Sequence, residues 1–168
     1  MNIVLCGMMG VGKSSVGRRI AKIANRKWVD TDCLIRKRHG NIPHIFARYG
    51  EEYFRGLETE VVRELSGQDG LVISTGGGLV LKEENCELLK ANGNIFFLNA
   101  SLETLLSRIR DDGSRPLLNG GDKAQRLRDL MGVRMPVYET VADHTVMTDK
   151  KSVDRIAREI LALAEGNK

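Results

Sequence analysis

The chain has 168 residues, of which 42% are apolar and 29% charged; this suits one compact domain and excludes an intrinsically disordered protein. Its apolar runs are far shorter than the ~18 residues of a membrane-spanning helix, and we expect no signal peptide because the N-terminus lacks a basic segment. The 26 Lys and Arg against 22 Asp and Glu leave a net charge of +4, which fits an ordinary surface, a small-anion site or nucleic-acid binding.

Short apolar runs alternate along the chain with stretches of helical periodicity. The runs predict five strands, at residues 3–6, 28–30, 71–74, 95–98 and 145–147. Apolar residues recur on one helix face around 16–23, 102–109 and 153–163, with Ser152 as a candidate N-cap. Strands that are apolar throughout are buried on both faces. The sequence therefore predicts an α/β fold, a three-layer sandwich in which helices cover both faces of a parallel sheet, with ligands at the carboxyl ends of the strands.

Residues 7–14 follow the first predicted strand and match G-x-x-x-x-G-K-[ST], the phosphate-binding loop. Glycines allow backbone N–H groups to turn toward phosphate oxygens, Lys13 is placed for the β- and γ-phosphates, and Ser14 for Mg²⁺. A chance glycine-rich turn would match this pattern in roughly one chain in a hundred or fewer. The segment therefore predicts binding of a nucleoside triphosphate.

Asp30 and Asp32 follow the second predicted strand. The third and fourth predicted strands end without the Asp that GTPases and motor ATPases place there. One of the two acids can support Mg²⁺ while the other accepts a hydrogen bond from an attacking hydroxyl. The alternative is that both only cap the following helix. Beside a phosphate-binding loop, we favour the catalytic interpretation.

Arg55 and Glu58 are three residues apart and share one helix face. They form either an ordinary surface ion pair or, facing the cleft, a clamp for a substrate carboxylate. The triplet at 76–78 consists of glycines and follows the third predicted strand. We expect main-chain N–H groups there to approach a ligand closely, because a simple turn explains three glycines poorly.

The long polar stretch at 111–122 contains Arg115, followed by Pro-Leu-Leu. A loop of this length is typical of a lid or of a disordered segment; if it closes as a lid, Arg115 would meet the transferring phosphoryl group. Arg134 and Tyr138 lie one turn apart on a predicted helix, where the arginine alone would be an ordinary surface residue. The three cysteines lack metal-ligand spacing, and we expect them to be small buried residues.

These motifs, in this order and along the whole chain, resemble those of the shikimate kinases. The phosphate-binding loop is generic, whereas the Asp-Thr-Asp, Phe-Arg, Gly-Gly-Gly and Arg-Pro-Leu-Leu segments form a specific set. The resemblance implies a P-loop kinase fold like that of nucleoside monophosphate kinases. It implies one domain over 1–168 with a five-stranded parallel sheet of order 2-3-1-4-5, substrate-binding helices at about 31–60 and a lid at about 111–123.

The resemblance also implies the reaction and the residues that serve it. ATP would phosphorylate the 3-hydroxyl of shikimate, giving shikimate 3-phosphate and ADP, in the biosynthesis of aromatic amino acids. The implied catalytic residues are Lys13, Asp32 and Arg115. The implied ATP-binding residues are Gly10, Val11, Gly12, Lys13, Ser14, Ser15, Arg115 and Lys151. The implied shikimate-binding residues are Asp32, Phe46, Phe54, Arg55, Gly77, Gly78 and Arg134. The implied cofactor is Mg²⁺, held at Ser14 and Asp30.

Two departures from the family pattern and several alternatives remain. His44 replaces a usually acidic residue, and Lys150 and Lys151 stand where arginine is more usual. A kinase for another small polyhydroxy acid such as gluconate is the nearest alternative. A non-catalytic nucleotide-binding module would have lost one of the acids or arginines of these motifs. A nucleic-acid-binding protein would have more aromatic residues than the 5% of this chain. We therefore expect ATP and shikimate as partners, no nucleic acid or membrane, and a cytoplasmic monomer.

Overall fold

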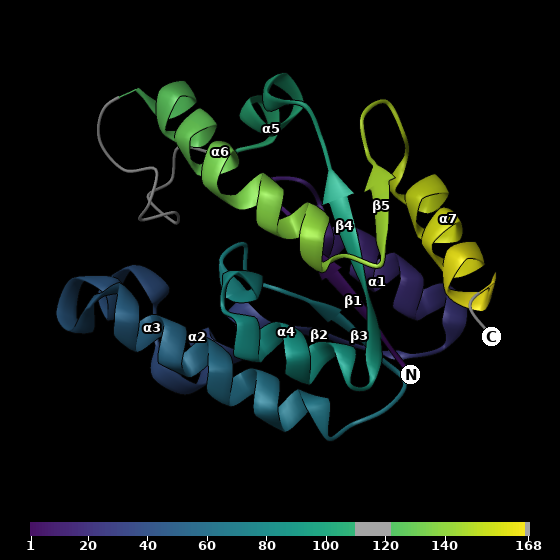
Figure 1. Ribbon diagram of the computed structural model, residues 1–168, viewed down its shortest axis with the longest axis horizontal. Helices are drawn as coiled ribbons and strands as arrows, with labels where there is room; N and C mark the ends of the chain where they lie inside the picture. Colours follow the sequence, from purple (N-terminus) through teal and green to yellow (C-terminus); the bar gives the residue numbers. More distant parts are fainter. Residues whose placement is uncertain (110–121, 167–168) are drawn as a thin grey trace.

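The computed structural model describes residues 1–109 and 122–166, in which five parallel strands form one sheet (Figure 1). The strands are β1 Asn2–Cys6, β2 Lys27–Asp30, β3 Leu71–Ser74, β4 Gly93–Asn99 and β5 His144–Met147. The helices are α1 Lys13–Ala24, α2 Thr31–His39, α3 Ile42–Ser66, α4 Glu83–Lys90, α5 Leu102–Arg108, α6 Lys123–Val141 and α7 Val153–Gly166, with a 3-10 turn, η1, at Leu79–Leu81. The strand order β2-β3-β1-β4-β5 confirms the predicted fold and topology.

Helices cover both faces of the sheet, which makes the three-layer sandwich expected from the sequence (Figure 1). α1 packs against α7 on one face, while α4 and α6 pack against β4 on the other. All residues of β1 and β3 are buried, as are most of β4, whereas the edge strands β2 and β5 are partly exposed. Burial on both faces is the reason that the inner strands are apolar throughout.

The parallel register brings the carboxyl ends of the strands to one edge of the sheet. In this register Asp30 of β2 and Leu5 of β1 both pair with Ser74 of β3, and Cys6 pairs with Phe97 of β4. The segments that leave these strands therefore start side by side. They are the phosphate-binding loop, the Asp-Thr-Asp segment and the glycine triplet, so the sheet positions all three motifs at a common edge.

α2 and α3 pack against each other and occupy the segment expected to bind substrate, although α3 continues to Ser66. Gly50 has φ 83° and ψ 172° and divides α3 into two helical pieces. The segment 110–121, which holds most of the expected lid, lies outside the described residues, and Lys123 already belongs to α6. None of the described helices is both long enough and apolar enough to cross a membrane.

The cysteines depart in one case from the expected burial. Cys6 and Cys86 are buried, but Cys33 is exposed on α2. The buried residues of α2 are Thr31 and Ile35, one turn apart. Residue 33 lies halfway between them in the sequence and therefore on the opposite side of the helix. The prediction that Cys33 is buried was wrong because this side of α2 faces solvent.

Candidate active site

A cleft of about 250 Å³ lies at the carboxyl edge of the sheet. Its lining residues are Met9, Gly10, Gly12, Lys13, Ser14, Ser15, Asp30, Asp32, Thr75 and Gly77. Three motifs that are separated in the sequence thus contribute to one cavity. The structure brings together the phosphate-binding loop, both predicted acids and the glycine triplet.

The phosphate-binding loop wraps around the Lys13 ammonium group. Lys13 Nζ donates to the carbonyls of Gly7 and Met8, at 2.8 and 3.0 Å. Burial lowers the pKa of Lys13 to about 8, an effect that the negative charge of Asp32 partly offsets. Gly12 precedes α1 with φ 104°, a left-handed backbone conformation that favours glycine. The loop therefore presents a buried cation and a helix N-terminus to the cleft, which together suit phosphate.

Asp30 caps α2, as one of the two interpretations predicted, and it also contacts the phosphate-binding loop. Its Oδ1 accepts a hydrogen bond from the Cys33 amide at 3.0 Å and so caps α2. Its Oδ2 accepts one from Ser14 Oγ at 2.6 Å. The hydroxyl and carboxylate thus form an adjacent pair of oxygen ligands beside the phosphate-binding loop.

This oxygen pair fits Mg²⁺. The ion is usually held by one or two protein oxygens, with substrate phosphates and waters completing its octahedral shell. In residues 1–109 and 122–166 no group of three or more His, Cys, Asp or Glu side chains could hold a metal by itself. Ser14 and Asp30 are therefore the residues in the cleft that suit the ion when it arrives with a nucleotide.

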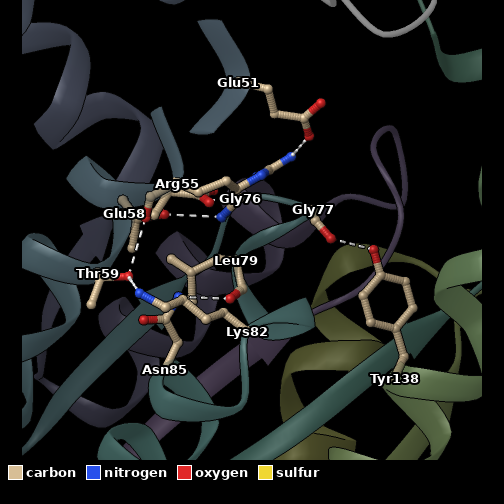
Figure 2. Close-up of polar contacts among 11 residues, drawn as sticks. Glu51, Arg55, Glu58, Thr59, Gly76, Gly77, Leu79, Lys82, Asn85 and Tyr138 are labelled. Atoms are coloured by element: carbon tan, nitrogen blue, oxygen red, sulfur yellow. Dashed lines mark hydrogen bonds and ion pairs between the residues drawn. The ribbon is translucent and has the colours of Figure 1, made fainter. Parts of the chain in front are cut away.

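Arg55 forms ion pairs with two glutamates, of which Glu58 is buried and Glu51 is exposed (Figure 2). Its Nη1 donates to Glu58 Oε2 at 2.7 Å, and its Nη2 donates to Glu51 Oε1 at 2.8 Å. The pair expected from the spacing of Arg55 and Glu58 is present, but it is no solvated surface pair, because the Glu58 side chain is only 1% exposed. Burial raises the pKa of Glu58 to about 7, while the Arg55 charge acts in the opposite direction.

The glycine triplet at 76–78 leaves room for the charged side chains of Asp32 and Arg55. A Cβ on Gly76 would lie 2.6 Å from Asp32 Oδ1, and a Cβ on Gly78 would lie 2.5 Å from Arg55 Nη2. Gly78 has φ −97°, which any residue can adopt. Glycine is needed at these positions because a side chain would displace the acid and the guanidinium group, and not because the backbone is left-handed.

α6 brings Arg134 and Tyr138 to the same triplet. Both are buried, with side chains 3% and 0% exposed, so Arg134 is no ordinary surface arginine. A Cβ on Gly77 would lie 3.1 Å from Arg134 Nη1, and the Tyr138 hydroxyl donates to the Gly77 carbonyl (Figure 2). Burial raises the pKa of Tyr138 to about 12, so the hydroxyl keeps its proton at neutral pH. Two guanidinium groups therefore flank the triplet, from α3 and from α6.

Some predicted residues do not line this cleft. Phe54 is 5% exposed and belongs to the hydrophobic core, and Phe46 packs against it with ring centroids 4.9 Å apart. Val11 is buried, and its carbonyl accepts a hydrogen bond from Arg108 Nη1 at 3.1 Å. The aromatic pair supports α3 from the core side, and Val11 connects the loop to α5.

The expected ATP-binding residues Arg115 and Lys151 lie away from this cleft or outside the described residues. A cavity of about 430 Å³ lies between α5 and the turn after β5 and is lined by Ser101, Glu103, Thr104, Ser107, Asp149 and Lys150. Lys151 is not in that lining, and its Nζ forms an ion pair with Glu159 at 2.7 Å. Arg115 falls within 110–121, outside the described residues.

Two threonines in the site were not predicted. Thr75 lines the cleft and donates to the Leu5 carbonyl at 3.0 Å, and Thr31 Oγ1 accepts from the Gly76 amide at 2.9 Å. Their positions are informative in retrospect, because Thr31 stands between the two acids and Thr75 directly precedes the glycine triplet. The hydroxyl of Thr31 connects these two motifs.

The shikimate kinase family model matches residues 9–165 of this chain. A shikimate kinase of Caldicellulosiruptor saccharolyticus is 44% identical, over 96% of this chain and 94% of the relative. One of Pelotomaculum thermopropionicum is 45% identical, over 95% and 93%.

Solved structures agree with these sequence relatives. Shikimate kinase from Acinetobacter baumannii, in complex with shikimate, superposes with a TM-score of 0.95 at 40% identity, covering 99% of this chain and 94% of that one. A gluconokinase from Sinorhizobium meliloti covers 99% of this chain and 94% of its own with a TM-score of 0.64, but at 21% identity. That second likeness shows a shared fold alone.

Proposed function

This chain belongs to the shikimate kinase family and phosphorylates shikimate with ATP, and we propose that it acts on the 3-hydroxyl through the cleft at the carboxyl edge of the sheet. One observation carries this proposal. The phosphate-binding loop and Asp32 line the same cavity, and two arginines, of which Arg134 is buried and Arg55 half-buried, flank the glycine triplet at its edge. The products are shikimate 3-phosphate and ADP, formed on the way to aromatic amino acids.

In the phosphate half of the site, loop amides and Lys13 bind the β- and γ-phosphates of ATP. Gly10, Gly12 and Ser15 belong to this half because they line the cleft with Lys13. The Lys13 ammonium group is already surrounded by loop carbonyls, so little reorganisation is needed when charge develops on the phosphoryl oxygens. Ser14 and Asp30 would hold Mg²⁺. The ion supplies charge neutralisation on the phosphates when bound.

In the acceptor half, Arg55 and Arg134 bind the shikimate carboxylate, since paired guanidinium groups suit a planar anion. Glu58 holds the Arg55 guanidinium group at 2.7 Å. Gly77 and Gly78 let the ring approach the main chain, and Phe46 with Phe54 supports the apolar side of the substrate-binding helix.

Asp32 orients the attacking hydroxyl and accepts its proton. The hydroxyl oxygen forms a bond to the γ-phosphorus while the bond from that phosphorus to the β–γ bridging oxygen breaks, and the electron pair leaves with ADP. Because phosphoryl transfer needs little covalent help from the protein, positioning and charge are the main contributions of these residues.

Arg115 and the segment 111–123 complete the proposal. We assign the segment as a lid that brings Arg115 to the γ-phosphate, and the cavity beside Lys150 as the adenine site. Val11 and Lys151 are assigned to ATP binding by the family resemblance, although neither lines that cavity. All three cysteines are free thiols, which fits a cytoplasmic enzyme. We expect a monomer in solution, which light scattering would test.

The decisive experiment measures ADP release from ATP with and without shikimate, and with gluconate in a parallel series. We expect ADP release that depends on shikimate and on Mg²⁺, with phosphate transferred to the substrate. The gluconate alternative is disfavoured, because sequence relatives above 40% identity are shikimate kinases. Turnover with gluconate and none with shikimate would overturn the proposal.

A further inference from the structure

Trp28 connects the edge strand β2 to the main chain of Lys13 through one buried side chain. The indole Nε1 of Trp28 donates to Ser74 Oγ at 3.0 Å, and Ser74 Oγ donates to the Lys13 carbonyl at 3.0 Å. Ser74, the last residue of β3, is 1% exposed. A hydroxyl has one proton to give. Because the indole occupies a lone pair of the Ser74 oxygen, that proton is directed to the Lys13 carbonyl.

We call the two hydrogen bonds that join Trp28, Ser74 and the Lys13 carbonyl the relay. The relay lies against Gly17 of α1. A Cβ on residue 17 would lie 2.5 Å from Ser74 Oγ and 2.6 Å from Trp28 Nε1. Gly17 is inside a regular helix, where glycine costs up to about 1 kcal/mol relative to alanine. The glycine is explained by space, since it lets α1 approach the Trp28–Ser74 hydrogen bond.

The relay sets the distance between α1 and β2. The hydrogen bond between Ser14 and Asp30 in the cleft depends on the same distance. Ser14 is the next residue after Lys13 on α1, and Asp30 is two residues after Trp28 on β2, so Trp28 and Asp30 share one face of the strand. The hydrogen bond from Ser14 to Asp30 spans the same gap between α1 and β2, at 2.6 Å. The register also pairs Asp30 with Ser74.

We propose that Trp28 is a positioning residue for nucleotide binding: through Ser74 it fixes the first turn of α1 against β2, and thereby the Ser14–Asp30 pair that receives ATP with Mg²⁺. Trp28 does not line the cleft and touches none of the reacting groups. The proposal rests on the proposed function for the roles of Lys13, Ser14 and Asp30.

The aromatic ring alone does not explain why residue 28 is a tryptophan. It is half-buried, and the Arg18 guanidinium carbon lies 4.7 Å from the ring centroid on its outer side. Phenylalanine would retain an aromatic ring for that contact and for packing. The indole differs by its N–H group, which is the donor in the relay.

The test compares Trp28→Phe, Ser74→Ala and the double variant with the parent protein. We expect Trp28→Phe to raise the KM for ATP in excess Mg²⁺ by about three- to tenfold, the range for one neutral hydrogen bond, while the KM for shikimate stays unchanged. The double variant should equal Ser74→Ala alone, because the indole acts through that hydroxyl. Lys37→Ala is the matched control, since Lys37 lines the same outer groove as Trp28 but does not contact the relay.

A second readout is independent of turnover. Trp28 is the sole tryptophan of the chain, so its fluorescence reports on the relay directly. We expect titration of the parent with ADP and Mg²⁺ to change the emission. In Ser74→Ala, which keeps the tryptophan, the midpoint should move to higher nucleotide concentration by the same factor as the KM.

Three results would overturn the inference: an unchanged KM for ATP in Trp28→Phe, an equal rise in both KM values, or a fall in kcat alone in proportion to the folded fraction. Failure of the proposed function has a different signature. In that case the parent protein itself releases no shikimate-dependent ADP, whereas the fluorescence titration still measures nucleotide binding.

Discussion

The two halves of the cleft are built in different ways. The phosphate half comes mainly from one continuous segment, in which loop carbonyls and a helix N-terminus surround Lys13, and Asp30 joins it from the end of β2. The acceptor half is assembled from α2, α3, α6 and the glycine triplet, and its charged groups are side chains. The first half depends on local backbone conformation, and the second depends on the packing of distant elements.

Glycines show this difference most clearly. Gly12 has φ 104° and open space where a Cβ would be, so a side chain there would strain the backbone without meeting a neighbour. Gly78 has φ −97°, but its Cβ would collide with Arg55. The same residue type therefore serves backbone conformation at Gly12 and space at Gly78.

The largest expected effect separates chemistry from nucleotide binding. Asp32→Asn keeps the shape of the side chain but removes the proton acceptor, so turnover should fall by about 100- to 10,000-fold. ATP binding, measured by calorimetry, should stay within a factor of two or so, since Asp32 is assigned to the acceptor half. Near-normal turnover would contradict the assigned role of this carboxylate.

Lys13→Met should lower turnover by about 100- to 1,000-fold, because a preorganised cation is lost beside the transferring phosphoryl group. Unlike Asp32→Asn, this variant should also weaken ATP binding, while shikimate binding measured without nucleotide is retained. Circular dichroism should show an intact fold. Loss of shikimate affinity would indicate that the two halves are not separable.

Gly78→Ala tests the acceptor half by displacing the end of the Arg55 side chain. We expect the KM for shikimate to rise by about ten- to a hundredfold, the range for a hydrogen bond to a charged group, with little change for ATP. Gly56→Ala is the matched control. A Cβ on Gly56 meets nothing within 4 Å, so both KM values should be unchanged.

Gly12→Ala tests the phosphate half through the backbone. Holding a side chain in the left-handed region should lower the free energy of unfolding by about 1–2 kcal/mol, measured by urea denaturation. Gly78→Ala should change it by less than about 0.5 kcal/mol, because the end of a flexible arginine can move aside. Equal losses in both variants would remove the contrast between the two glycines.

The last contrast is the pH dependence of stability, and the halves should differ in its sign. Burial raises the Glu58 pKa from 4.5 to about 7, so between these values the folded protein holds the extra proton and the free energy of unfolding falls as pH rises. Burial lowers the Lys13 pKa from 10.5 to about 8, so in that window the unfolded chain holds the extra proton and stability rises with pH.

Urea midpoints measured across both windows check these slopes. Glu58→Gln should flatten the decline between pH 4.5 and about 7, and Lys13→Met should flatten the rise between about 8 and 10.5. Each variant should leave the other window unchanged. A slope that survives the corresponding substitution would assign the titration to another group.

Much of the fold was predictable because its determinants are local. Each of the five predicted strands is within two residues of the observed bounds, since apolar runs between turn residues mark buried strands. The Arg55–Glu58 pair also follows from helix spacing. The exposure of Cys33 was not predicted, because it depends on which face of α2 packs against the rest of the protein.

The sequence by itself determined the phosphate-binding loop, the two acids and the α/β alternation, since each is specified by neighbouring residues. Only the tertiary structure decided that Arg134 is buried beside Gly77, that the triplet makes room for Arg55 and Asp32, and that Trp28 reaches Lys13 through Ser74. Trp28 and Ser74 are 46 residues apart, and Arg134 is farther still from Gly77. Contacts of this kind depend on sheet register and helix packing, which no local pattern specifies.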